Sequence, residues 1–65
     1  MPSIPTVWVP GKILASTDLS IRFESAYATD WVPLSMIIDS DKDLEKGVEL
    51  EIELPQWLAE EKEFV

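Results

Sequence analysis

Residues 48–54, with the sequence VELEIEL, place aliphatic and glutamate side chains in strict alternation. Successive side chains of a β-strand point to opposite faces, so this pattern predicts a strand with one apolar and one acidic face. Pro55 closes the strand and suits the first position of a helix, where its missing N–H costs nothing. We therefore expect a short helix over residues 56–63, held against the sheet by Trp57 and Leu58.

Earlier in the chain, residues 19–24 alternate Leu, Ile and Phe with Ser, Arg and Glu, which indicates a half-buried strand. Residues 6–15 are rich in β-branched and aromatic side chains but are interrupted by Pro10 and Gly11. Because proline cannot donate to a central ladder, we expect a bent or bulged strand at the edge of the sheet.

The middle of the chain predicts short elements. Residues 31–33 form a short strand that ends at its own proline, residues 34–38 form one helical turn, and residues 39–47 form a polar loop. The expected fold is one α+β domain over residues 1–65. It is a small antiparallel sheet or half-open barrel of about four strands with one short C-terminal helix.

Three tryptophans are many for a chain of 65 residues. Large aromatic side chains fill a small core efficiently, so we expect Trp31 and Trp57 to be buried. Trp8 is different, because it projects outward if Val7 and Val9 face the core. An exposed tryptophan is a candidate interface anchor.

Histidine and cysteine are both absent. Their absence removes the commonest general base, the thiolate nucleophile and the preferred ligands of zinc. A serine nucleophile would need a lysine as its base, and the lysines stand in sequence contexts typical of exposed side chains. We expect no enzymatic activity, no cofactor and no disulfide.

The charge of the chain is concentrated in its second part. The formal net charge is -8, and residues 39–65 hold ten acidic residues beside three lysines. Nucleic acids and anionic membranes repel such a surface, so a basic macromolecular partner is favoured. No stretch reads as a signal peptide or a spanning helix, and we expect a cytoplasmic protein.

The acidic residues predict a binding face that imitates DNA. Carboxylates two residues apart on a strand are about 6.8 Å apart, and each strand of duplex DNA carries one phosphate per roughly 3.4 Å of axis. Such a face can enter a basic groove and exclude the nucleic acid. The predicted face comprises Asp39, Asp41, Asp43, Glu45, Glu49, Glu51, Glu53, Glu60, Glu61 and Glu63.

Two stretches carry a resemblance. Residues 31–37, WVPLSMI, and residues 48–62, VELEIELPQWLAEEK, resemble short proteins of phages and plasmids that show W-x-P-x-S-x-I and an ending like L-x-I-P-x-W-L-A-E-E-K. Leu34 and Leu54 stand where that pattern more often has lysine and isoleucine. In size, acidity and lack of catalytic residues the chain is also similar to phage anti-CRISPR proteins. These resemblances imply an inhibitor from a mobile element that blocks a host nucleic-acid-binding complex.

The alternative is an accessory module of a phage or plasmid replication or recombination system. Such a module would dock through Trp8 and the expected edge strand. We expect a monomer in either case, because Pro10 and Gly11 would blunt that edge.

Residues 39–43, DSDKD, begin like a calcium-binding EF-hand loop. The sixth place holds Leu44 in place of glycine, and the twelfth holds Leu50 in place of glutamate, so the sharp turn and the bidentate ligand are missing. We therefore predict no calcium site. Titration calorimetry with calcium chloride should show no micromolar binding, and a micromolar site would contradict this interpretation.

Overall fold

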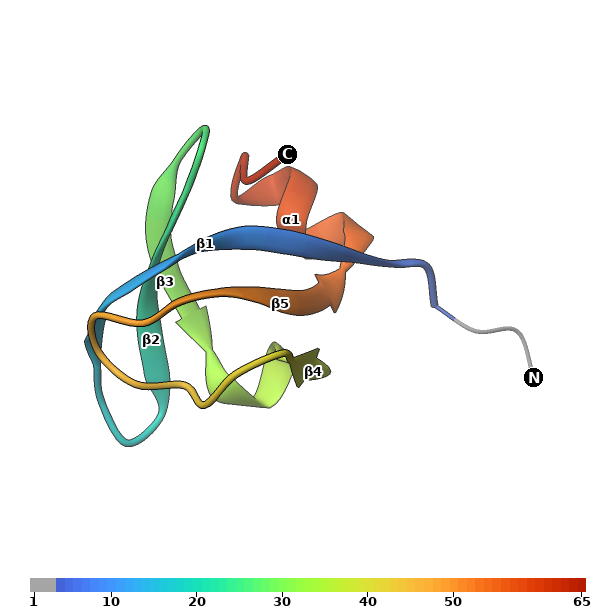
Figure 1. Cartoon of the computed structure of the whole chain (residues 1–65). Coiled ribbons are helices and arrows are strands. Elements are labelled where there is room, and N and C mark those ends of the chain that lie inside the picture. Colours follow the sequence, from blue (N-terminus) through green and yellow to red (C-terminus); the bar gives the residue numbers. More distant parts are fainter. Residues whose placement is uncertain (1–3) are drawn as a thin grey trace.

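The computed structural model describes residues 4–65 as an open antiparallel sheet with one short helix (Figure 1). The elements are β1 (Thr6–Ser16), β2 (Ser20–Ser25), β3 (Thr29–Pro33), the 3-10 turn η1 (Leu34–Met36), β4 (Asp39–Ser40), β5 (Glu49–Pro55) and α1 (Gln56–Glu61). The expected antiparallel sheet with a C-terminal helix is confirmed, but the sheet has five strands. The additional strand is β4, which lies inside the stretch that we expected to be a loop.

β1 lies in the middle of the sheet, so its predicted position at the edge is wrong. The strand order is β3-β2-β1-β5-β4. Residues 6–12 of β1 pair with β5, and the pairing with β2 begins only at Gly11. At Pro10, β1 therefore has a neighbour on one side only.

The missing N–H of Pro10 removes no hydrogen bond between strands at this position. Glu51 lies opposite Pro10 but directs its backbone away from β1. Its N–H donates to Asp41 Oδ1 at 2.9 Å, and its carbonyl accepts from the Asp41 N–H at 3.1 Å. A proline is compatible with a central strand here because β2 has not yet joined β1 at this residue and Glu51 bonds to Asp41 on its other side.

Gly11 permits the close approach of β1 and β2. A Cβ atom at this position would come within 2.5 Å of a ring carbon of Phe23 and closer still to the carbonyl oxygen of Glu24. No side chain fits into that space, so the bend requires glycine.

The core lies on the inner face of the sheet, which α1 covers. The alternation in β5 is confirmed: Leu50, Ile52 and Leu54 are buried, whereas Glu49 and Glu51 are exposed. The complete core comprises Val9, Ile13, Ile21, Phe23, Val32, Leu50, Ile52, Leu54, Leu58, Ala59 and Phe64.

Trp31 and Trp57 are 41% and 51% exposed, so the prediction that they are buried is wrong. Trp31 alternates with Val32, and Val32 takes the inner position on β3. On α1, Leu58 and Ala59 are the buried residues, and Trp57 is left outside. The large aromatic side chain that fills the core is Phe64, whose ring meets that of Phe23 edge-on at 5.5 Å between centroids.

The end of α1 brings Phe64 into the core. The helix ends at Glu61, and Glu63 adopts a left-handed conformation with φ of 62°. The N–H of Phe64 then donates to the carbonyl of Ala59 at 2.9 Å, and the N–H of Glu63 donates to that of Glu60 at 3.1 Å. This is the Schellman pattern, with glutamate where glycine is usual.

Gly11→Ala should destabilise the fold strongly because the added methyl group has no room. Overpacking of this kind costs about 1 to 3 kcal/mol. One of the two clashing groups is the backbone carbonyl of Glu24, which cannot move aside as a side chain could. Gly47→Ala is the control for backbone strain without a clash: its φ of +87° disfavours alanine, but nothing lies within 4 Å of the added carbon. Urea denaturation should show a larger loss of unfolding free energy for Gly11→Ala, and equal losses would contradict the steric argument.

Candidate functional site: the outer face of β4 and β5

β5, β4 and the residue that follows β4 place five carboxylates along the outer face of the sheet and its adjoining edge. Glu49, Glu51 and Glu53 form one row on β5, opposite the side that faces the core. Asp39 of β4 lies directly across from Glu53. Asp41 joins the same edge, since its backbone and side chain both bond to Glu51. We call these five residues the acidic strand surface.

β1 adds an aromatic and a basic side chain beside this surface. Trp8 lies opposite Glu53, and Lys12 lies opposite Glu49. Trp8 is 46% exposed, as expected from its place between Val7 and Val9. The hydroxyl of Thr6 donates to Glu53 Oε2 at 2.6 Å and holds that carboxylate in place. The predicted anchor and the strand carboxylates therefore share one face.

The remaining predicted acidic residues lie elsewhere. Asp43 and Glu45 are exposed in the connection from β4 to β5. Glu60, Glu61 and Glu63 belong to α1 and its end, which pack over the inner face of the sheet. The structure therefore does not unite the ten acidic residues in one face, because the sheet separates the helix carboxylates from those of β5.

Within residues 4–65, the one ion pair joins Lys62 Nζ to Asp30 Oδ2 at 3.4 Å. The carboxylates of the acidic strand surface have no such partner among these residues. Lys42 lies nearby, but its ammonium donates to the backbone carbonyl of Glu49 at 3.2 Å.

A shallow groove of about 590 Å³ lies over the bend of β1, at one end of the acidic strand surface. Its lining includes Lys12 together with the carboxylates of Glu24, Asp41, Glu49 and Glu51. Among the described residues, no group of three or more acidic side chains is arranged to hold a metal ion.

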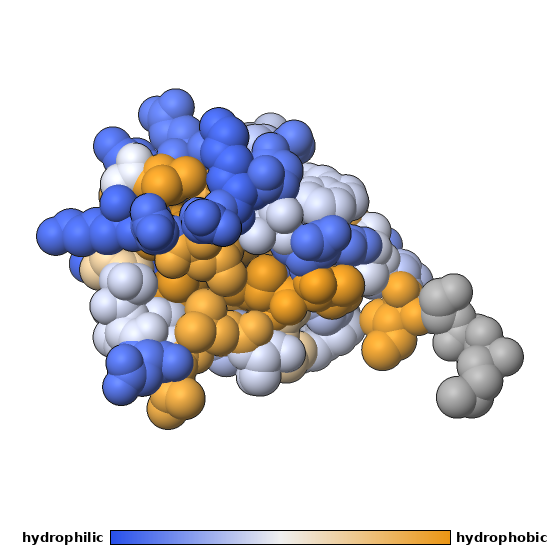
Figure 2. Space-filling view, turned by 60° about the horizontal axis from the view of Figure 1, so that its bottom comes forward, coloured by the Kyte–Doolittle hydropathy of each residue, from blue (hydrophilic) through white to orange (hydrophobic). Residues whose placement is uncertain are grey.

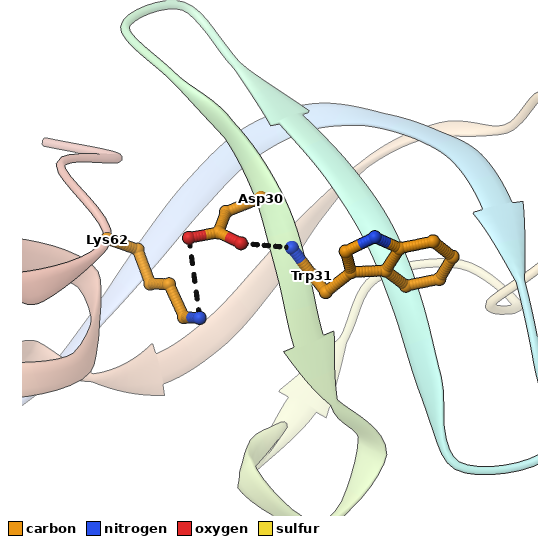
Figure 3. A network of polar contacts seen from close by, with 3 residues as sticks. All are labelled: Asp30, Trp31 and Lys62. Carbon is orange, nitrogen blue, oxygen red and sulfur yellow. Dashed lines mark hydrogen bonds and ion pairs between the residues drawn. The ribbon is translucent and has the colours of Figure 1, made fainter.

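On the free edge of β3, the N–H of Trp31 is already bonded (Figure 3). Ser25 and Ala28 form a hydrogen-bonded pair, so the alternation of the ladder turns the N–H of Trp31 away from β2. That N–H donates to Asp30 Oδ1 at 2.7 Å, and Lys62 holds the other carboxylate oxygen. Pro33 has no N–H to offer.

At the edge formed by β4, an aspartate side chain also accepts the N–H of the next residue. Asp39 Oδ1 accepts the N–H of Ser40 at 2.8 Å, and the strand has two residues. Side-chain capping and short length are known ways to discourage strand addition. From the sequence we expected Pro10 and Gly11 to discourage strand addition at an edge. In the structure the outward N–H groups of Trp31 and Ser40 are instead bonded by the side chains of Asp30 and Asp39.

Comparisons with protein-family models, curated proteins and solved structures gave no match. Within residues 4–65, no helix has the length and apolar character needed to cross a membrane.

Asp39→Asn should stabilise the domain because Asp39 and Glu53 are like charges directly opposite each other on neighbouring strands. Asparagine keeps the oxygen that accepts the Ser40 N–H. We expect a gain of ~0.5 kcal/mol in unfolding free energy at low salt, which shrinks in 1 M NaCl, where the Debye length is about 3 Å. Asp43→Asn removes the same charge from the loop and should change less; equal gains would argue against local repulsion.

Proposed function

We propose that this protein is a non-enzymatic inhibitor that occupies the basic nucleic-acid-binding groove of another protein through its acidic strand surface. The observation that carries the proposal is the row of three carboxylates on the outer face of β5 with Asp39 and Asp41 at the adjoining edge, without an ion pair among residues 4–65.

The sheet holds these charges at regular distances. Carboxylates along β5 are spaced by about 6.8 Å, and neighbouring strands are about 4.8 Å apart, so the charges form two rows. The strands are rigid, so little conformational entropy is lost when the surface binds. An acidic face opposite a basic groove also raises the association rate.

The kind of target follows from the resemblance to phage and plasmid proteins and to anti-CRISPR proteins. RNA-guided interference complexes hold nucleic acid in a positively charged channel. We propose such a complex as the partner, with the nucleic acid excluded by competition.

A second candidate is an accessory module of a replication or recombination system that docks through Trp8. The 46% exposure of Trp8 on the outer face favours it. The capped edges imply that such docking would use side chains of this face in place of strand addition.

The decisive experiment compares two triple variants that change the net charge equally. Glu49→Gln, Glu51→Gln and Glu53→Gln together neutralise the β5 row, whereas Glu60→Gln, Glu61→Gln and Glu63→Gln neutralise the helix side. The readout is displacement of a labelled duplex from RNA-guided interference complexes, measured at several salt concentrations. We expect the β5 variant to lose roughly tenfold or more in inhibition, mostly through slower association, and the helix variant to stay near wild type.

Trp8→Ala separates the two candidates. Under DNA mimicry it should reduce inhibition less than the β5 variant does. If the two triple variants inhibit equally well and Trp8→Ala does not inhibit, the strand carboxylates are not the binding surface and docking through Trp8 replaces the proposal.

A further inference from the structure

A second surface lies at the lower end of the sheet, where η1 and the connection from β4 to β5 close the core. Figure 2 shows an apolar band across this side, bordered by hydrophilic side chains. We call it the apolar end. It comprises the exposed Leu19 and Ile38 and the half-buried Leu34, Met36, Ile37, Leu44 and Val48.

Backbone hydrogen bonds anchor three segments of this surface to the fold. The N–H of Leu34 donates to the carbonyl of Leu19 at 2.8 Å, and the N–H of Ile37 donates to that of Leu34 at 3.1 Å. Val48 accepts from the N–H of Ile13 at 3.0 Å. The apolar end is therefore a fixed part of the fold, even though Leu19 and Ile38 remain 80% and 53% exposed.

Carboxylates follow the apolar end along the chain. Asp18 precedes Leu19, Asp39 follows Ile38, and Leu44 stands between Asp43 and Glu45. All four acidic residues are exposed, and none has an ion pair among residues 4–65. Lys42 and Lys46 stand in the same connection as Leu44, but Lys42 donates to the carbonyl of Glu49, and the acidic residues outnumber the two lysines. An apolar centre with a border that is acidic on balance complements an apolar stripe flanked by lysine or arginine.

We propose that the apolar end binds a basic amphipathic helix of a partner protein. An extended segment is disfavoured because the N–H of Ser40 on the adjoining edge strand is already bonded to Asp39. A second copy of the chain is disfavoured because two acidic borders would face each other. A helix with one apolar face and basic flanks satisfies both requirements. This surface adjoins the acidic strand surface at Asp39, which borders both, but its apolar residues are not part of that surface and the proposal does not depend on its function.

The probe is a designed, fluorescein-labelled helical peptide with leucines on one face and lysines on the other, and binding is followed by fluorescence anisotropy. Ile38→Ser and Val65→Ser form a matched pair, because Val65 is similarly exposed at 57% but follows α1 at the other end of the domain. We expect Ile38→Ser to weaken binding about fivefold, and Leu19→Ser combined with it about tenfold or more, with Val65→Ser unchanged.

Equal affinities for the Ile38→Ser and Val65→Ser variants would overturn the proposal, since binding would then depend on charge alone. Complete loss of binding in 0.5 M NaCl would overturn it as well. The Gln variant of Glu49, Glu51 and Glu53 should keep most of its peptide affinity. The peptide assay can thus fail while duplex displacement succeeds, and the reverse.

Discussion

The bend of β1 at Pro10 and Gly11 allows one strand to serve two sets of neighbours. Residues 6–12 of β1 pair with β5, and the pairing with β2 begins at Gly11 and continues to Ser16. Gly11 is where both pairings meet, and its lack of a side chain lets the ring of Phe23 lie against the backbone. The core, the placement of α1 and the outer face of β5 all depend on this approach. A domain of this size buries a smaller share of its surface than a larger one, so it has little stability to lose at such a contact.

The elements with strong two-residue alternation could be predicted from the sequence, and they carry the site. β5 and β2 were expected with nearly their observed bounds, and the outward carboxylates of β5 followed directly. Trp31 and Trp57 could not be placed correctly, because apolar neighbours indicate a buried segment but not which side of it faces inward. Phe64 was missed since it follows the helix and enters the core only through the left-handed turn at Glu63. β4 could not be predicted because it has two residues with a polar sequence, and only its pairing with β5 makes it a strand.

The acidic residues of the chain lie in separate regions of the fold, because the sheet and the helix form different layers. The sheet divides the strand carboxylates from those of α1, and the loop carboxylates border an apolar surface. Net charge reports on solubility and association in general, but only the layering tells which carboxylates can act on one partner at once. Trp8, which entered the sequence argument as a rival to the acidic face, lies directly beside it. A partner that contacts Glu53 would therefore also contact the indole of Trp8.

The pairing of β1 with β5 also orders the assembly of the domain. The hairpins of β1 with β2 and of β2 with β3 close short loops, whereas the bond from Thr6 to Glu53 spans 47 positions. Long loops cost more entropy to close, so the meander of β1 to β3 is favoured to form before β5 docks. The strand that carries the carboxylates thus completes the sheet last. A partly folded chain therefore lacks the ordered row of glutamates that the proposed function requires.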